Sequence, residues 1–257
     1  MARLLRDGVA LAYDDEGRGE PPLVFVHGLA CNRRFWPSQL LHFAARHRVI
    51  AVDLRGHGES DAPDQRYRIQ ALADDVAWTC EQLGAVRPVI VGHSMGGLIG
   101  LELAAAEPGR VRAVVMIDSV LLPGGEREAV VQHVLAGLRG PDPERTLRSY
   151  FGPFFGPTDD PELAAWVLDE MVRTPPHVTS SVWEESLENW SDAGALARAT
   201  VPLAYLDAGT PTADLRRAVA LQPGMTVGRT IGSGHFSPLV VPAQINAMLE
   251  RFLEIAR

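Results

Sequence analysis

Residues 89–98 read VIVGHSMGGL, and this stretch decides the fold. A short apolar run ends at Gly92, a single serine stands at position 94, and an apolar helical pattern begins at Met95. In the pattern Gly92-x-Ser94-x-Gly96, the glycines leave out side chains where a sharp strand-to-helix turn brings backbone segments together. Such a turn presents the serine hydroxyl at a helix N-terminus, where free N–H groups favour developing negative charge. The stretch therefore predicts a nucleophilic serine between a strand and a helix.

Apolar strands and helical patterns alternate on both sides of this turn. Residues 2–14 predict a β-hairpin around an Asp-Gly turn. Apolar runs predict strands at 23–26, 48–52, 88–91, 111–117, 201–206 and 225–230. Apolar residues at helical spacing predict helices at 37–46, 70–83, 95–106, 213–220 and 242–256. We therefore predict an α/β fold with a mostly parallel, doubly wound sheet of about eight strands, which binds ligands at the carboxyl ends of its strands.

The alternation stops between residues 121 and 199. Helical segments there are broken by proline- and glycine-rich stretches at 139–143 and 152–161, and no run predicts a strand. The aromatic residues of this span are Tyr150, Phe151, Phe154, Phe155, Trp166, Trp183 and Trp190. We therefore expect an α/β core formed by residues 1–120 and 200–257, with residues 121–199 inserted as a helical cap over the carboxyl edge of the sheet.

Composition excludes several classes of protein. The formal net charge of −8 argues against binding to nucleic acid or anionic membranes. All basic residues are arginine, and the lack of lysine removes Schiff-base, pyridoxal-linked and P-loop chemistry. Cys31 and Cys80 lack the spacing of a zinc site, so we expect neither a metal nor a cofactor. Without an apolar run of about 20 residues or a secretory signal at the start, a cytoplasmic protein is expected.

Several polar positions at strand ends could act on one substrate. A serine hydroxyl such as that of Ser94 needs a base, and an imidazole held by a carboxylate is the usual base at neutral pH. His235 lies in a glycine-flanked loop after the last predicted strand, so it is the candidate base. Asp118 and Asp207 each end an earlier strand, so both are candidate acids.

The sequence resembles the α/β-hydrolase superfamily over its whole length. The resemblance rests on four motifs in the superfamily's order and spacing, which are Val26-His27-Gly28, DLRGHGES at 53–60, GHSMGG at 92–97 and Gly234-His235-Phe236. It implies Ser94 as the nucleophile, His235 as the base, and an oxyanion hole formed by the backbone N–H groups of Leu29 and Met95. The position of Met95 at a helix start beside the nucleophile agrees with that role.

The resemblance leaves the acid open. Superfamily members usually carry Gly-x-x-Asp after the strand that corresponds to 202–206, but here the position three beyond Gly209 is Thr212. Asp207 falls inside the end of the strand rather than in the loop. Asp118 ends the strand after the nucleophile helix, a position that supplies the acid in some subgroups of the superfamily. We choose Asp118 and keep Asp207 as the alternative.

These residues predict a serine hydrolase that cleaves an apolar carboxylic ester or lactone through an acyl-enzyme intermediate. Serine at position 94 argues against the relatives that use an aspartate nucleophile, epoxide hydrolases and haloalkane dehalogenases. C–C bond hydrolases, acyltransferases and perhydrolases use the same constellation, and a non-catalytic ligand-binding protein on this scaffold is a further alternative. The expected partner is a small molecule rather than nucleic acid or a membrane, and the sequence is compatible with a homodimer.

Overall fold

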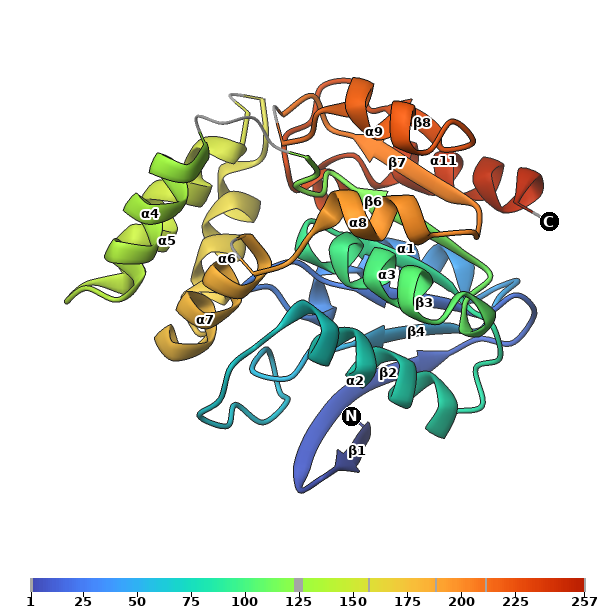
Figure 1. Ribbon diagram of the computed structural model, residues 1–257, viewed down its shortest axis with the longest axis horizontal. Coiled ribbons are helices and arrows are strands. Elements are labelled where there is room, and N and C mark those ends of the chain that lie inside the picture. The colour runs from blue at the N-terminus through green and yellow to red at the C-terminus, as the bar shows by residue number, and fades with distance from the viewer. Residues whose placement is uncertain (1, 123–126, 157, 188, 211, 257) are drawn as a thin grey trace.

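One eight-stranded sheet forms the centre of the computed structural model (Figure 1). The structure describes residues 2–122, 127–156, 158–187, 189–210 and 212–256. The strands lie in the order β1-β2-β4-β3-β5-β6-β7-β8. Strands β1 (Ala2–Arg6) and β2 (Val9–Glu16) form the predicted antiparallel hairpin, and β2 also runs antiparallel to β4. All the other neighbouring strands are parallel, which confirms the predicted mostly parallel sheet.

The parallel strands lie within two residues of their predicted bounds. They are β3 (Leu23–Val26), β4 (Val49–Val52), β5 (Val89–His93), β6 (Ala113–Ile117), β7 (Leu203–Asp207) and β8 (Thr226–Arg229). Every residue of β3 to β7 is buried, which explains why these strands show no polar alternation. Strand β8 lies at the edge of the sheet, and its residues alternate between half-buried and exposed.

Helices cover both faces of the sheet. Helices α1 (Pro37–Phe43) and α11 (Pro242–Ile255) pack on one face, around Phe43 and Phe252. The other face is covered by α2 (Ile69–Gln82), α3 (Met95–Ala106), α8 (Asp192–Arg198) and α9 (Leu215–Leu221), and Figure 1 shows α2, α3 and α8 in front of the sheet. Helix α3 is buried almost throughout, which accounts for its continuously apolar sequence. The helix predicted to reach residue 46 ends at Phe43, and turns lead from there into β4.

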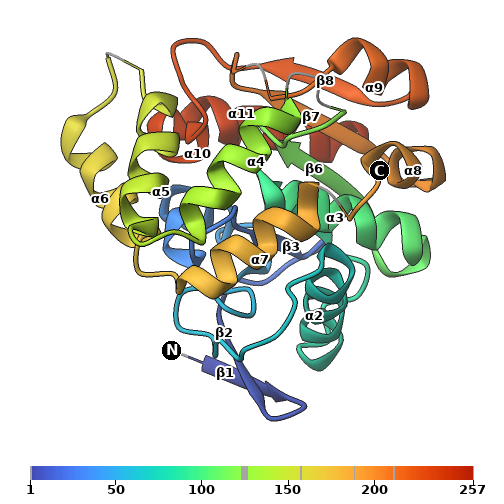
Figure 2. The ribbon, with the colours of Figure 1, turned by 60° about the vertical axis from the view of Figure 1, so that its left-hand side comes forward.

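Four further helices follow one another between β6 and β7. They are α4 (Arg127–Leu138), α5 (Pro143–Phe151), α6 (Pro161–Met171) and α7 (Pro176–Leu187), with the short turn η3 (Gly152–Phe154) after α5. We call them the α4–α7 segment; they lie together beyond the carboxyl ends of the parallel strands (Figures 1 and 2). Within residues 121–199, no described residue belongs to a strand of the sheet.

The proline-rich breaks in this span are helix starts. Asp142 caps α5 by accepting a hydrogen bond from the Arg145 N–H at 3.0 Å, and a proline follows it as the first helical residue. Asp160 caps α6 in the same way through the Glu162 N–H at 2.9 Å. An acidic cap followed by proline is a favourable helix start, because the proline lacks an N–H that would otherwise need a partner.

Short 3-10 turns η1 (Arg33–Phe35) and η2 (Pro108–Arg110) and the one-turn helix α10 (Ser237–Val240) complete the regular elements. The helices that the structure describes include none with the length and apolar character needed to span a membrane.

Candidate active site

Ser94 stands at the turn between β5 and α3 in a conformation that few residues adopt. Its φ of 52° lies in the left-handed region, where a residue with a side chain carries a cost of about 1–3 kcal/mol. Hydrogen bonds hold the turn, since the Ser94 N–H donates to the Ile117 carbonyl at 2.9 Å and the Gly97 N–H donates to the Ser94 carbonyl at 3.1 Å. The strained turn is thereby fixed with Ser94 at the carboxyl end of the sheet.

Glycine at position 96 lets this turn pack directly on the neighbouring strand. A Cβ atom added at Gly96 would lie 2.1 Å from the carbonyl oxygen of Val26, at the end of β3. A Cβ atom at Gly92 would lie 2.2 Å from the Gly96 carbonyl. Both distances are far below any van der Waals contact, so the two glycines of the motif are required by close backbone approach.

The structure places His235 against Asp118 and not against Asp207. The His235 Nδ1 lies 2.7 Å from Asp118 Oδ2, and both side chains are buried. Asp118 directly follows β6, the strand beside β5, so its carboxylate reaches the same sheet edge as Ser94. An imidazole that donates from Nδ1 to a carboxylate presents Nε2 for proton transfer, as a general base requires.

Three donors from the loop after β7 complete the surroundings of Asp118. The Ala208 N–H donates to Oδ1 at 3.1 Å, Thr212 Oγ1 lies 3.3 Å from Oδ1, and the Thr210 hydroxyl donates to Oδ2. Burial alone would raise the pKa of Asp118, but the hydrogen bond and charge of His235, together with the hydrogen bonds from Thr210 and the Ala208 N–H, lower it overall. Asp118 is therefore an ionised carboxylate at neutral pH. Sequence reasoning did not identify either threonine as a partner of the acid.

Asp207 faces the opposite way, toward the edge strand. Its Oδ2 accepts a hydrogen bond from Arg229 Nε at 2.6 Å, and its Oδ1 accepts one from the Gly209 N–H at 2.7 Å. Arg229 is its direct partner in the register between β7 and β8. The strand pairing thus gives Asp207 a structural partner away from His235.

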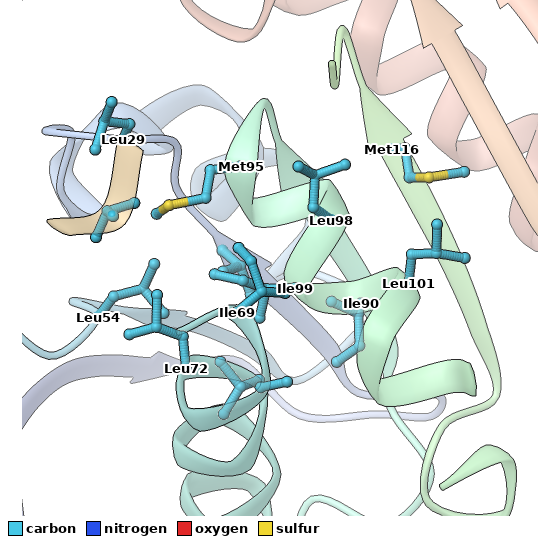
Figure 3. Packing of buried hydrophobic residues seen from close by; sticks show 14 of the residues in the cluster. Leu29, Leu54, Ile69, Leu72, Ile90, Met95, Leu98, Ile99, Leu101 and Met116 are labelled. Carbon is cyan, nitrogen blue, oxygen red and sulfur yellow. The ribbon is translucent and has the colours of Figure 1, made fainter. Parts of the chain in front are cut away.

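The two segments expected to supply an oxyanion hole flank Ser94. Leu29 lies in the loop after β3, where a Cβ atom added at Gly28 would stand 3.0 Å from Ser94 Cβ. Met95 is the first residue of α3, and the first N–H groups of a helix have no partner within that helix. Figure 3 shows the Leu29 and Met95 side chains within one buried cluster, on the loop and the helix respectively. The oxyanion hole formed by their backbone N–H groups stays a prediction.

Side chains of the α4–α7 segment reach this loop. Asn32 Nδ2 donates to Glu170 Oε2 at 2.9 Å, and the Thr174 hydroxyl donates to the Ala30 carbonyl at 3.3 Å. Glu170 is buried and also accepts hydrogen bonds from Arg34 and Arg173. The loop that carries Leu29 is therefore held from both the sheet and α6.

Aromatic rings from the α4–α7 segment surround the base. The ring centroids of Phe154 and Phe151 lie 5.1 Å and 6.5 Å from that of His235, and Phe155 stacks on Phe236 at 4.8 Å. The tryptophans of residues 121–199 have other contacts. Trp166 packs on Phe35, Trp183 donates to the Val131 carbonyl, and Trp190 donates to Glu102.

His27 and His57, from the other two motifs, support the backbone. His27 Nδ1 donates to the Gly28 carbonyl at 2.7 Å and its Nε2 accepts from the Leu54 N–H at 3.0 Å. His57 Nδ1 donates to the Arg55 carbonyl at 3.0 Å. Across the described ranges, no cluster of three or more His, Cys, Asp or Glu side chains could hold a metal ion.

Three buried imidazoles predict that mild acid destabilises the protein. Burial lowers the pKa values of His27, His57 and His93 to about 4, about 3 and about 3. In the unfolded chain each imidazole titrates near its ordinary value of about 6.5, so unfolding takes up protons below that pH. The free energy of unfolding should therefore fall, by about 1.4 kcal/mol per pH unit for each imidazole, as the pH decreases from 6.5 toward 4. Chemical denaturation at a series of pH values measures this slope.

The variant His57→Asn provides the control for this slope. Asparagine keeps a donor near the position of Nδ1, which bonds the Arg55 carbonyl, but it does not titrate. In this variant the free energy of unfolding should change less steeply with pH, by about 1.4 kcal/mol per pH unit, because one imidazole fewer takes up a proton on unfolding. An unchanged slope would show that His57 is not held neutral by the fold.

Comparison with curated proteins relates the chain to several enzymes. Epoxide hydrolase 4 of Mus musculus is 31% identical over 170 residues, which are 65% of this chain and 45% of that protein. The non-heme chloroperoxidase of Streptomyces lividans is 41% identical over 117 residues, which are 44% of this chain and 42% of that protein. The matches thus span less than half the length of these two relatives.

Solved structures share the whole fold. The enol-lactonase from Burkholderia xenovorans LB400 has a TM-score of 0.89 at 23% identity, covering 98% of this chain and 100% of that one. Est816, described as an N-acyl homoserine lactone degrading enzyme, has a TM-score of 0.85 at 26% identity, with the same coverage of 98% and 100%. The family model for the alpha/beta hydrolase fold matches residues 21–189. The chain therefore belongs to the α/β hydrolase family.

Proposed function

We propose that this protein is a serine hydrolase that cleaves an uncharged, apolar carboxylic ester or lactone. The observation that carries the proposal is the hydrogen bond of 2.7 Å between His235 and Asp118, at the sheet edge that also presents Ser94. A buried imidazole fixed by an ionised carboxylate can accept the proton of a neighbouring serine, which is the arrangement that serine hydrolysis requires.

The proposed reaction has two stages. Ser94 Oγ attacks the ester carbonyl while His235 Nε2 takes its proton, and the N–H groups of Leu29 and Met95 stabilise the oxyanion. The tetrahedral intermediate breaks the C–O bond, and the departing alkoxide takes the proton from His235. Water then attacks the acyl-enzyme with His235 as its base, and the acid leaves as Ser94 regains its proton. In a lactone, the alcohol and the acid remain parts of one product.

Apolar surroundings support a neutral acyl group. Leu29 and Met95 belong to the main hydrophobic cluster, and the rings of Phe151 and Phe154 flank His235. Binding there removes apolar surface from water, at about 25 cal/mol for each Å² buried. An unpaired carboxylate on the acyl group would lose its hydration without a counter-charge from these four side chains.

The comparisons support hydrolysis of esters or lactones over epoxide opening. Two of the structural relatives are described as a lactonase and a lactone-degrading enzyme. Epoxide hydrolase 4 is a relative as well, but Ser94 stands where the superfamily's epoxide hydrolases use an aspartate nucleophile. Transfer of the acyl group to hydrogen peroxide instead of water is a second candidate, favoured by the similarity to the non-heme chloroperoxidase.

A panel of nitrophenyl esters and lactones tests the substrate class. The decisive pair is nitrophenyl butyrate against nitrophenyl hemisuccinate, because their acyl chains have equal length and only the second carries a carboxylate. We expect kcat/KM to be at least about tenfold higher for the butyrate, because the charged acyl group stays unpaired. Preference for the hemisuccinate would contradict the neutral class. Hydrolysis of epoxides alone would contradict the proposal as a whole, and peracid formed in the presence of hydrogen peroxide would support the second candidate.

A further inference from the structure

The backbone carbonyl and the backbone N–H of His235 each form a hydrogen bond with a residue outside the loop that carries His235. The His235 carbonyl accepts a hydrogen bond from His93 Nε2 at 2.8 Å. The His235 N–H donates to the Phe154 carbonyl in η3 at 3.2 Å. With the contact between Nδ1 and Asp118, three separate elements contact one residue. Sequence reasoning gave no role to His93 or to the Phe154 backbone.

His93 is positioned by its strand and by burial to donate this hydrogen bond to the His235 carbonyl. It is the last residue of β5, directly before Ser94, and its ring centroid lies 4.6 Å from that of His235. Because a carbonyl can only accept, the His93 ring must carry its proton on Nε2. Burial holds the pKa of His93 far below its ordinary value, so the ring remains a neutral donor throughout the neutral range.

The Phe154 contact depends on glycine at position 234. A Cβ atom added at Gly234 would lie 2.0 Å from the Phe154 carbonyl oxygen, so no other residue fits between this loop and η3 as they stand. The α4–α7 segment therefore reaches the base through backbone as well as through the rings of Phe151 and Phe154.

We infer that His93 is a positioning residue, which together with the Phe154 carbonyl fixes the backbone of His235 so that its imidazole stays aligned between Asp118 and Ser94. This inference rests on the proposed serine hydrolysis. Asp118 alone holds the imidazole by one hydrogen bond, about which the ring can pivot. Anchoring the carbonyl and the N–H of the same residue fixes its Cα as well, and a displacement of about 1 Å in such a group can cost about 10²-fold in rate.

Two amide substitutions test the role of His93. In His93→Gln the side-chain nitrogen reaches the position of imidazole Nε2, whereas in His93→Asn it reaches only the position of Nδ1. We expect His93→Gln to retain most of the wild-type kcat and His93→Asn to lose about 10²-fold, with KM little changed in both. In His93→Asn the rate at which a fluorophosphonate labels Ser94 should fall together with kcat. Thermal unfolding of both variants reports whether they fold alike.

A separate variant tests the contact between the Phe154 carbonyl and the loop that carries His235. Gly234→Ala should lower kcat and the labelling rate, because the methyl group separates the loop from η3. Gly224→Ala is the matched control, since open space surrounds that position and its φ is not positive. This pair still tests the inference if a His93 variant fails to fold.

The outcomes separate the two proposals. Equal kcat in His93→Gln and His93→Asn, or equal kcat in Gly234→Ala and Gly224→Ala, would overturn the positioning role while the serine hydrolysis stands. Wild-type turnover that does not need Ser94 would instead overturn the proposed function.

Discussion

Replacing Ser94 by alanine should lower kcat for nitrophenyl esters by about 10⁶-fold. The alanine removes the atom that attacks the carbonyl, while His235 and Asp118 keep their hydrogen bond. The remaining rate should reflect only ester binding and stabilisation of the oxyanion by Leu29 and Met95. Purified wild-type and variant proteins, assayed at enzyme concentrations that make the background hydrolysis visible, measure the ratio.

Ser119→Ala is the matched control for this experiment. Ser119 is buried at the end of the neighbouring strand, and its Oγ has no hydrogen-bond partner among the described residues. The same change of serine to alanine at this position should leave ester hydrolysis near the wild-type level and leave the midpoint of thermal unfolding unchanged or raised. Loss of activity in both variants would point to a disturbed fold rather than to a missing nucleophile.

Asp118→Asn should lower kcat by about 10⁴-fold. The amide can donate toward His235 Nδ1 and so favours the wrong tautomer, and it no longer stabilises the imidazolium that forms during the reaction. The fold should persist, because asparagine has the same size, its oxygen can still accept from the Ala208 N–H, and the Thr210 hydroxyl can turn to accept from the new amide. Steady-state kinetics across the neutral pH range measure the effect.

Asp207→Asn separates the two candidate acids. Asp207 is buried, but its partner Arg229 is 68% exposed and can turn to solvent, and the asparagine oxygen can still accept from the Gly209 N–H. Asp207→Asn should therefore change stability by about 1 kcal/mol and leave kcat near the wild-type value. A collapse of kcat in Asp207→Asn alone would make Asp207 the acid and would contradict the assignment of Asp118.

Local patterns predicted most of the fold. The turn around Ser94 could be predicted because its causes lie within ten residues, namely an apolar strand, two glycines and an apolar helix. The parallel sheet followed from strands that lack polar alternation, since only burial on both faces allows them. Strand and helix bounds shifted by a few residues because hydrogen bonds at the ends, such as those after Phe43, depend on the next element.

The surroundings of the acid and the base could not be predicted in this way. Asp118 accepts from Thr210 and Thr212 because β6 and β7 are neighbours in the sheet, and strand order does not follow from local periodicity. The absence of the usual acid at position 212 was visible, but the donor role of the threonine there was not. His93 likewise contacts a residue far along the chain, through a carbonyl that any amino acid would present.

Local sequence patterns also could not predict how the aromatic residues in 121–199 pack. Phe151 and Phe154 flank His235, whereas Trp183 and Trp190 donate to Val131 and Glu102. A helical sequence can show which of its sides is apolar, but not which neighbour that side meets. Which of these aromatic residues lie beside His235 is therefore known only from the structure.

Labelling with a fluorophosphonate followed by peptide mass spectrometry tests the nucleophile most directly. Trypsin does not cut before Pro88, so digestion yields a peptide of residues 69–110 in which Ser94 is the only serine. We expect this peptide to carry the phosphonyl group, labelling to be absent in Ser94→Ala, and ester hydrolysis to be lost in step with labelling. Full ester hydrolysis by a protein that carries no label on this peptide would contradict the account.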